Sequence, residues 1–153
     1  MLNEYQRLLA YLKIVYHNLT TLHRNLGPDE SWFGTHEQIG EWYEMIAGMI
    51  DDLSETGISL GFTEPSIADA VLAFQGEVLP TMPRSTDETL RLCAEYMRGA
   101  AGVMQTAEAV VPVNVASHLQ DLEYKLNKEA NYKIAQAIGA RAQRGTLEIE
   151  DDD

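Results

Sequence analysis

Two histidines and two carboxylates are the residues whose types and spacing could support chemistry. His23 and His36 lie on either side of the pair Gly27-Pro28, and Asp51 and Glu55 follow four residues apart. Imidazole nitrogen and carboxylate oxygen are together the ligands that suit iron, manganese or zinc. The sequence therefore predicts a metal site built from these four side chains.

The elements that must position the four residues are helices. Apolar residues recur at alternating steps of three and four on both sides of Gly27-Pro28, which is the spacing of one helix face. Glycine commonly ends a helix and proline cannot continue one. We expect one helix from Tyr5 to Leu26 and a second from Ser31 to about Leu60, with Asp29 or Ser31 as its cap.

The second half of the chain predicts another pair of long helices, preceded by a short one from Ile67 to about Gln75. The run Ser85-Thr86-Asp87-Glu88 has the pattern of a capping box, which satisfies free amides at a helix start. Apolar stripes then run from Leu90 to Val110 and from Val115 to Ile138, with Pro112 between them. We expect an all-α four-helix bundle with a short extra helix in the middle connection.

The length of the chain fits one ordinary domain, since 153 residues can bury a core of their own. We expect the bundle to occupy residues 1–144, with the last long helix ending near Arg144. The remaining residues, 145–153, are rich in Glu and Asp and are expected to form a disordered acidic tail.

The helix positions decide which of the four ligands can meet. His23 lies about one turn before the corner and His36 about one turn after it, so antiparallel helices can bring the rings together. Asp51 and Glu55 share a face of the second helix. His36 and Asp51 are about 22 Å apart along that helix, at 1.5 Å per residue. An antiparallel two-fold dimer would join the histidines of one chain to the acids of the other, giving two shared sites.

The charge of the chain limits its partners. Lys and Arg number 11 against 24 Asp and Glu, which gives a formal net charge of −13. This field repels phosphate backbones, so we expect no direct nucleic-acid binding. We also expect no membrane span and no signal peptide, because the sequence has no long apolar run. The single Cys93 cannot form an internal disulfide, which favours the cytoplasm.

Short motifs in the predicted first two helices carry the order and spacing of a known family. They are Leu22-His23-Arg24-Asn25, Gly27-Pro28, His36-Glu37 and Ile50-Asp51-Asp52-Leu53-Ser54-Glu55. Over residues 12–61 the chain resembles the Dps branch of the ferritin-like family, in which a His from each of these helices binds iron with an Asp and a Glu of the two-fold partner. The resemblance implies iron ligation by His23, His36, Asp51 and Glu55. It also implies ferroxidase activity, usually with peroxide, inside a homo-oligomeric shell of twelve subunits.

Departures from the family pattern favour a second interpretation. Gly40 stands where the family often has another acid, and Arg24 replaces the aromatic residue that usually follows the first His, although Trp32 could supply one from the corner. The cation of Arg24 should discourage a second metal ion. The segment Val111–Ser117 also differs from the family's corner between the last two helices. The alternative is therefore a helical scaffold or interaction protein whose metal site has degenerated.

The remaining candidates for chemistry are expected to be structural. His17 and His118 have no partner that the sequence can place, so we expect structural or surface roles for both. Cys93 and the methionines fall on or near helix stripes, where they are expected to fill the core.

Overall fold

A computed structural model describes the backbone of residues 1–151 and the side chains of residues 1–144. This part of the chain contains helices and no sheet; an isolated bridge pairs Leu26 with Arg84. The helices are α1 (Glu4–Arg24), α2 (Trp32–Ser59), α3 (Ile67–Ala73), α4 (Thr86–Ala107), α5 (Val113–Lys128) and α6 (Ala135–Asp151), with short helical turns η1 (Gln75–Glu77), η2 (Glu108–Val110) and η3 (Glu129–Ile134). The predicted all-α bundle with an extra helix between α2 and α4 is confirmed.

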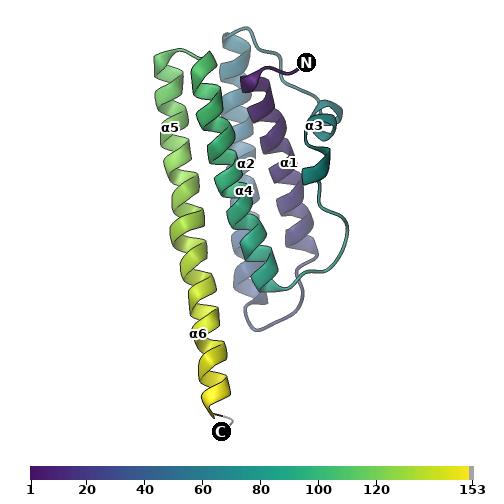
Figure 1. The fold of residues 1–153 in the computed structure, drawn as a ribbon. Coiled ribbons are helices and arrows are strands. Elements are labelled where there is room, and N and C mark those ends of the chain that lie inside the picture. Colours follow the sequence, from purple (N-terminus) through teal and green to yellow (C-terminus); the bar gives the residue numbers. More distant parts are fainter. Residues whose placement is uncertain (152–153) are drawn as a thin grey trace.

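The bundle is built from two helical hairpins (Figure 1). α1 packs against α2 and α4, α4 packs against α5, and the short α3 lies against α1. α5, the π-helical turn η3 and α6 form one long rod, whose last turns project beyond the other helices (Figure 1). Within residues 1–151, no helix has both the length and the apolar character needed to cross a membrane.

The core lies along the predicted apolar stripes, because residues spaced by three and four share one helix face. Leu8, Leu12, Ile39 and Ile46 are fully buried there. Met97 and Met104 are also buried, as predicted. Cys93 is fully buried, and burial raises the pKa of its thiol, so the thiolate needed for reactivity is disfavoured.

The start of α4 forms only half of the predicted capping box. The Ser85 hydroxyl accepts a hydrogen bond from the backbone N–H of Glu88, at 3.2 Å, as predicted. The Glu88 carboxylate does not return to Ser85; its Oε1 lies 3.9 Å from Nε of the buried Arg84. The guanidinium attracts the carboxylate that would have completed the box.

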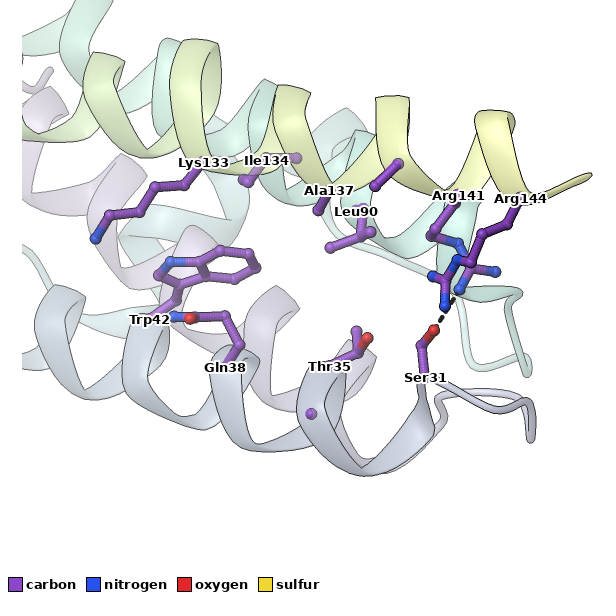
Figure 2. A pocket seen from close by; sticks show the side chains of 12 residues that line it. Ser31, Thr35, Gln38, Trp42, Leu90, Lys133, Ile134, Ala137, Arg141 and Arg144 are labelled. Carbon is purple, nitrogen blue, oxygen red and sulfur yellow. Dashed lines mark hydrogen bonds between the residues drawn. The ribbon is translucent and has the colours of Figure 1, made fainter.

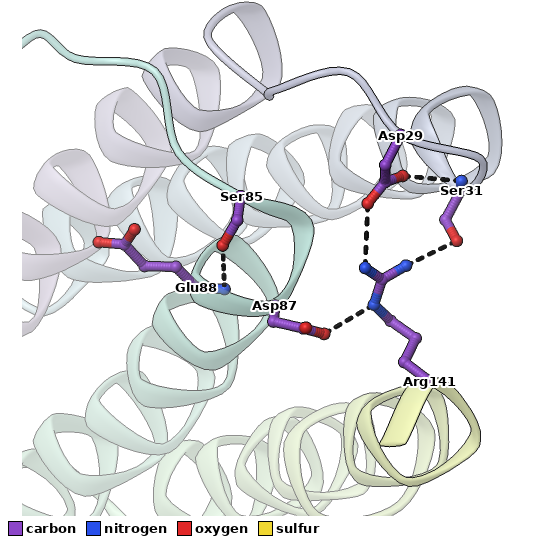
Figure 3. A network of polar contacts seen from close by, with 6 residues as sticks. All are labelled: Asp29, Ser31, Ser85, Asp87, Glu88 and Arg141. Carbon is purple, nitrogen blue, oxygen red and sulfur yellow. Dashed lines mark hydrogen bonds and ion pairs between the residues drawn. The ribbon is translucent and has the colours of Figure 1, made fainter. Parts of the chain in front are cut away.

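Of the two residues predicted to cap α2, the Ser31 side chain does not do so, whereas the Asp29 carboxylate accepts a backbone N–H at the helix start. Ser31 is the N-cap residue, but its side chain makes no capping bond. Its hydroxyl accepts a hydrogen bond from Nη1 of Arg141, at 2.7 Å, and Asp29 accepts one from the Ser31 backbone N–H (Figure 3). Arg141 on α6 also bonds Asp29 and Asp87, so one guanidinium ties three segments together (Figure 3).

The last helix runs further than predicted. We expected an end near Arg144, but α6 continues to Asp151, so the expected acidic tail of residues 145–153 is helical as far as that residue. Residues 152 and 153 lie outside the described residues. A single glycine costs a helix interior about 1 kcal/mol, and Gly145 alone is therefore a weak terminator without a following proline.

Candidate metal centre

The corner between α1 and α2 places the two histidines. It is pinned to the segment before α4, because the Gly27 N–H donates to the Arg84 carbonyl at 2.7 Å and the Arg84 N–H donates to the Asn25 carbonyl at 3.2 Å. A Cβ at position 27 would lie 3.0 Å from the Arg84 oxygen, so this close approach favours glycine. His23 in the last turn of α1 and His36 in the second turn of α2 are thereby held side by side.

The two rings are locked by a reciprocal pair of hydrogen bonds. His23 Nδ1 lies 2.8 Å from the backbone oxygen of His36, and His36 Nδ1 lies 3.0 Å from the backbone oxygen of His23. A carbonyl oxygen can only accept, so both Nδ1 atoms carry the proton. In the neutral rings each Nε2 therefore keeps its lone pair, which is the state that binds metals.

Aromatic rings surround the pair and fix its orientation. The rings of His23 and His36 stack with centroids 3.7 Å apart, and the indole of Trp32 stacks on His36 at 4.4 Å. The ring of Tyr43 meets that of His23 edge-on. Burial, followed by the charges of His36 and Arg24, lowers the pKa of His23, which favours the neutral, metal-binding form at pH 7.

The two residues that depart from the family pattern, Gly40 and Arg24, both lie close to the histidines. A Cβ at position 40 would lie 3.4 Å from Cε1 of His23, so Gly40 leaves open the space beside that ring where an additional acid would project. Arg24 is exposed and follows His23 at the end of α1. Its positive charge opposes a second cation near the histidines.

Asp51 and Glu55 lie exposed one turn apart on α2. Neither carboxylate has a hydrogen-bond or ion-pair partner in the part of the chain whose side chains are described. Two like charges four residues apart repel each other on a helix surface, which makes a neutralising cation favourable there. The structure places this pair away from the histidines, as the predicted helix geometry requires.

No complete metal-binding group of three or more His, Cys, Asp or Glu side chains occurs within the described part of one chain. The structure thus brings His23 and His36 together but leaves Asp51 and Glu55 as a separate pair. His118 does have a partner that the sequence did not reveal: its Nε2 lies 2.6 Å from Oδ2 of Asp52. That contact joins α5 to α2 across 66 residues, and no local pattern could have shown it.

Comparison with known proteins places the fold. No protein-family model matches the chain, and no curated protein matches its sequence. Solved structures do: a Dps protein from Bacillus brevis aligns with a TM-score of 0.80 and 21% identity, over 88% of this chain and 92% of that one. The chain has the Dps fold. Dps92 from Deinococcus radiodurans matches with a TM-score of 0.76 and 18% identity, over 87% of this chain and 82% of the other.

A third Dps structure, from Staphylococcus aureus, has a TM-score of 0.72 and 12% identity, over 88% of this chain and 92% of that one. The Dps fold predicted from residues 12–61 is therefore confirmed over most of the chain. Because these identities are low, the comparison establishes how the helices are arranged. What the histidines and acids bind must be argued from their own geometry.

Proposed function

We propose that this protein binds Fe(II) and oxidises it at a site shared between two chains. His23 and His36 of one chain supply nitrogen ligands, and Asp51 and Glu55 of the partner subunit supply oxygen ligands. The observation that carries the proposal is the reciprocal pair of Nδ1–carbonyl hydrogen bonds, which leaves two Nε2 lone pairs free on stacked rings.

The chemistry follows from the charges of the ligands. Two neutral imidazoles and two carboxylates match the preference of iron for mixed nitrogen and oxygen ligands, which manganese and zinc share. The negative carboxylates interact more strongly with Fe(III) than with Fe(II), because the attraction grows with the charge of the ion. Reduction of one peroxide to two hydroxide ions takes two electrons, so the tightly bound Fe(II) supplies one and a second, more weakly bound Fe(II) supplies the other.

The assembly is part of the same proposal. Four ligands that cannot meet within one chain require at least a two-fold dimer. The Dps fold of the chain makes a closed shell of twelve subunits the assembly that we propose, with the product deposited inside it. In such a shell the exposed acids of α2 would be covered by a second copy of the same surface.

The competing function, a scaffold with a degenerate metal site, is favoured by two residues. Gly40 removes a further acid from beside His23, and Arg24 adds a positive charge there. Both changes weaken binding of a second ion more than of the first, since the four ligands named above remain. We therefore propose a site that holds one ion tightly.

Anaerobic Fe(II) titration tests the proposal. His36→Ala and Asp51→Ala should each lose the tight binding seen in the wild type, by tenfold or more in affinity. His17→Ala and Glu44→Ala are matched controls, because both residues are exposed on the same two helices, and they should bind as the wild type does. A wild type without tight binding, or equal binding by all four variants, would favour the scaffold instead.

A further inference from the structure

The seam between α2 and the rod formed by α5, η3 and α6 contains a pocket. Long side chains bridge the two elements: the Trp42 indole N–H donates to Oε2 of Glu129 at 3.2 Å, and Arg141 donates to the Ser31 hydroxyl at 2.7 Å. Between these two bridges lies a pocket of about 280 Å³, open on one side (Figure 2). None of the four proposed metal ligands lines it.

The inner wall of the pocket is apolar. It is formed by Trp42, Leu90 and Ile134, whose side chains are almost completely buried, and by Ala137 and Ala140 of α6. An apolar group in this pocket would contact the core and would be removed from water, which is favourable for binding. Small alanine side chains on α6 keep the space open, where a larger residue would fill it.

The polar rim of the pocket is cationic, although the chain as a whole is strongly acidic. Figure 2 shows Lys133 at one end of the pocket, with Arg141 and Arg144 together at the other. Lys133 is paired with Glu129, and Arg141 is paired with two aspartates. Arg144 has no partner among the residues whose side chains are described, so its guanidinium is available to an anion.

We propose that this pocket binds a small amphipathic carboxylate, of the size of a medium-chain fatty acid. The volume accommodates about nine non-hydrogen atoms at roughly 30 Å³ each, the share that a water molecule takes in the liquid. The carboxylate lies against Arg144, with Arg141 beside it, because guanidinium groups bind carboxylates with charge-assisted hydrogen bonds. The alkyl chain lies along Leu90 and Ile134 and ends near Trp42.

Fluorescence quenching tests this proposal on the assembled, metal-free protein. The chain has two tryptophans, so in a Trp32→Phe background the emission reports on Trp42 alone. Octanoate brominated at its methyl end should quench this emission saturably, and unlabelled octanoate should compete. Octanol should compete at least tenfold more weakly because it lacks the charge, and acetate should not compete because it lacks the chain.

Two variants and one control complete the experiment. Arg144→Gln should weaken binding about tenfold. Ala137→Phe should abolish it by filling the pocket, and residue 137 is exposed, so the substitution should leave the fold intact. Arg91→Gln, an exposed arginine that does not line the pocket, should bind as the parent does. Quenching that does not saturate, or that is equal in all three variants, would overturn the proposal.

Discussion

The hydrogen bonds of His23 and His36 determine which ring nitrogen each residue can offer. Each Nδ1 is bound to the other residue's carbonyl, so the backbone of one helix end holds the ring of the other. Trp32 closes one face of this stack. The sequence identified both histidines and suggested Trp32, because a helical corner has predictable geometry. It could not predict the reciprocal bonds, which depend on the angle at which α1 and α2 meet.

The carboxyl group of Glu123, within α5, leads to a prediction about how stability depends on pH. Burial and the nearby charge of Glu108 raise the pKa of Glu123 to about 7. The folded state therefore holds this proton more tightly than the unfolded state does. The stability that it contributes is present at low pH and is lost as the pH rises from about 4.5 to about 7.

Replacing Glu123 by Gln removes that loss. We expect Glu123→Gln to exceed the wild type by about 1 kcal/mol in free energy of unfolding at pH 8, with the difference vanishing near pH 5. Urea unfolding across this range measures it, and the exposed Glu37→Gln is the control. A difference that is constant with pH would show that the Glu123 carboxyl titrates normally.

The polar contacts between helices that are distant in the sequence could not be predicted from the sequence. Asp52 meets His118, and Arg141 meets Asp29 across 112 residues. The local sequence around each of these residues gives no indication of its partner. Their pairing depends on how the rod lies against α2 and α4, so it follows from the tertiary fold.

Element by element, the apolar periodicity predicted the helices well, because burial of one face determines where a helix can form. Helix ends were less predictable, as the starts of α2 and α4 show, since capping groups have competing partners. One departure from regular α-helix can be seen in the sequence. The apolar residues of the last stripe are spaced by four throughout: Leu126, Ala130, Ile134 and Ile138. A straight α-helix repeats every 3.6 residues, and the π-helical turn η3 absorbs the mismatch.

Replacing either of two glycines of α2 by Ala is predicted to change the stability of the protein, with opposite signs at the two positions. A Cβ at position 57 would lie 2.7 Å from Cε1 of the fully buried Tyr5, whereas a Cβ at position 48 would meet nothing within 4 Å. Gly57→Ala should therefore destabilise the protein by about 1–3 kcal/mol through overpacking. Gly48→Ala should stabilise it by about 0.5–1 kcal/mol, the gain in helix propensity. Urea unfolding compares them, and a stabilising Gly57→Ala would contradict the packing described for Tyr5.

For the whole molecule, the distance along α2 is the decisive quantity. The histidines near its start and the acids in its last third are too far apart to bind one ion within a chain. The described residues contain no complete group of ligands. We propose that a second copy of the chain completes the site. The function of this protein is therefore proposed for an assembly rather than for a single chain.

Mixing two inactive variants tests the shared site most directly. His36→Ala and Asp51→Ala assemblies would be dissociated, combined in equal amounts and reassembled before anaerobic Fe(II) titration. Random pairing makes half of the dimers mixed, and one of the two sites in each mixed dimer has all four ligands. We predict that mixing restores about a quarter of the number of tight Fe(II) sites in the wild type, whereas each variant alone has no tight site. No recovery in the reassembled mixture would contradict ligands drawn from two chains.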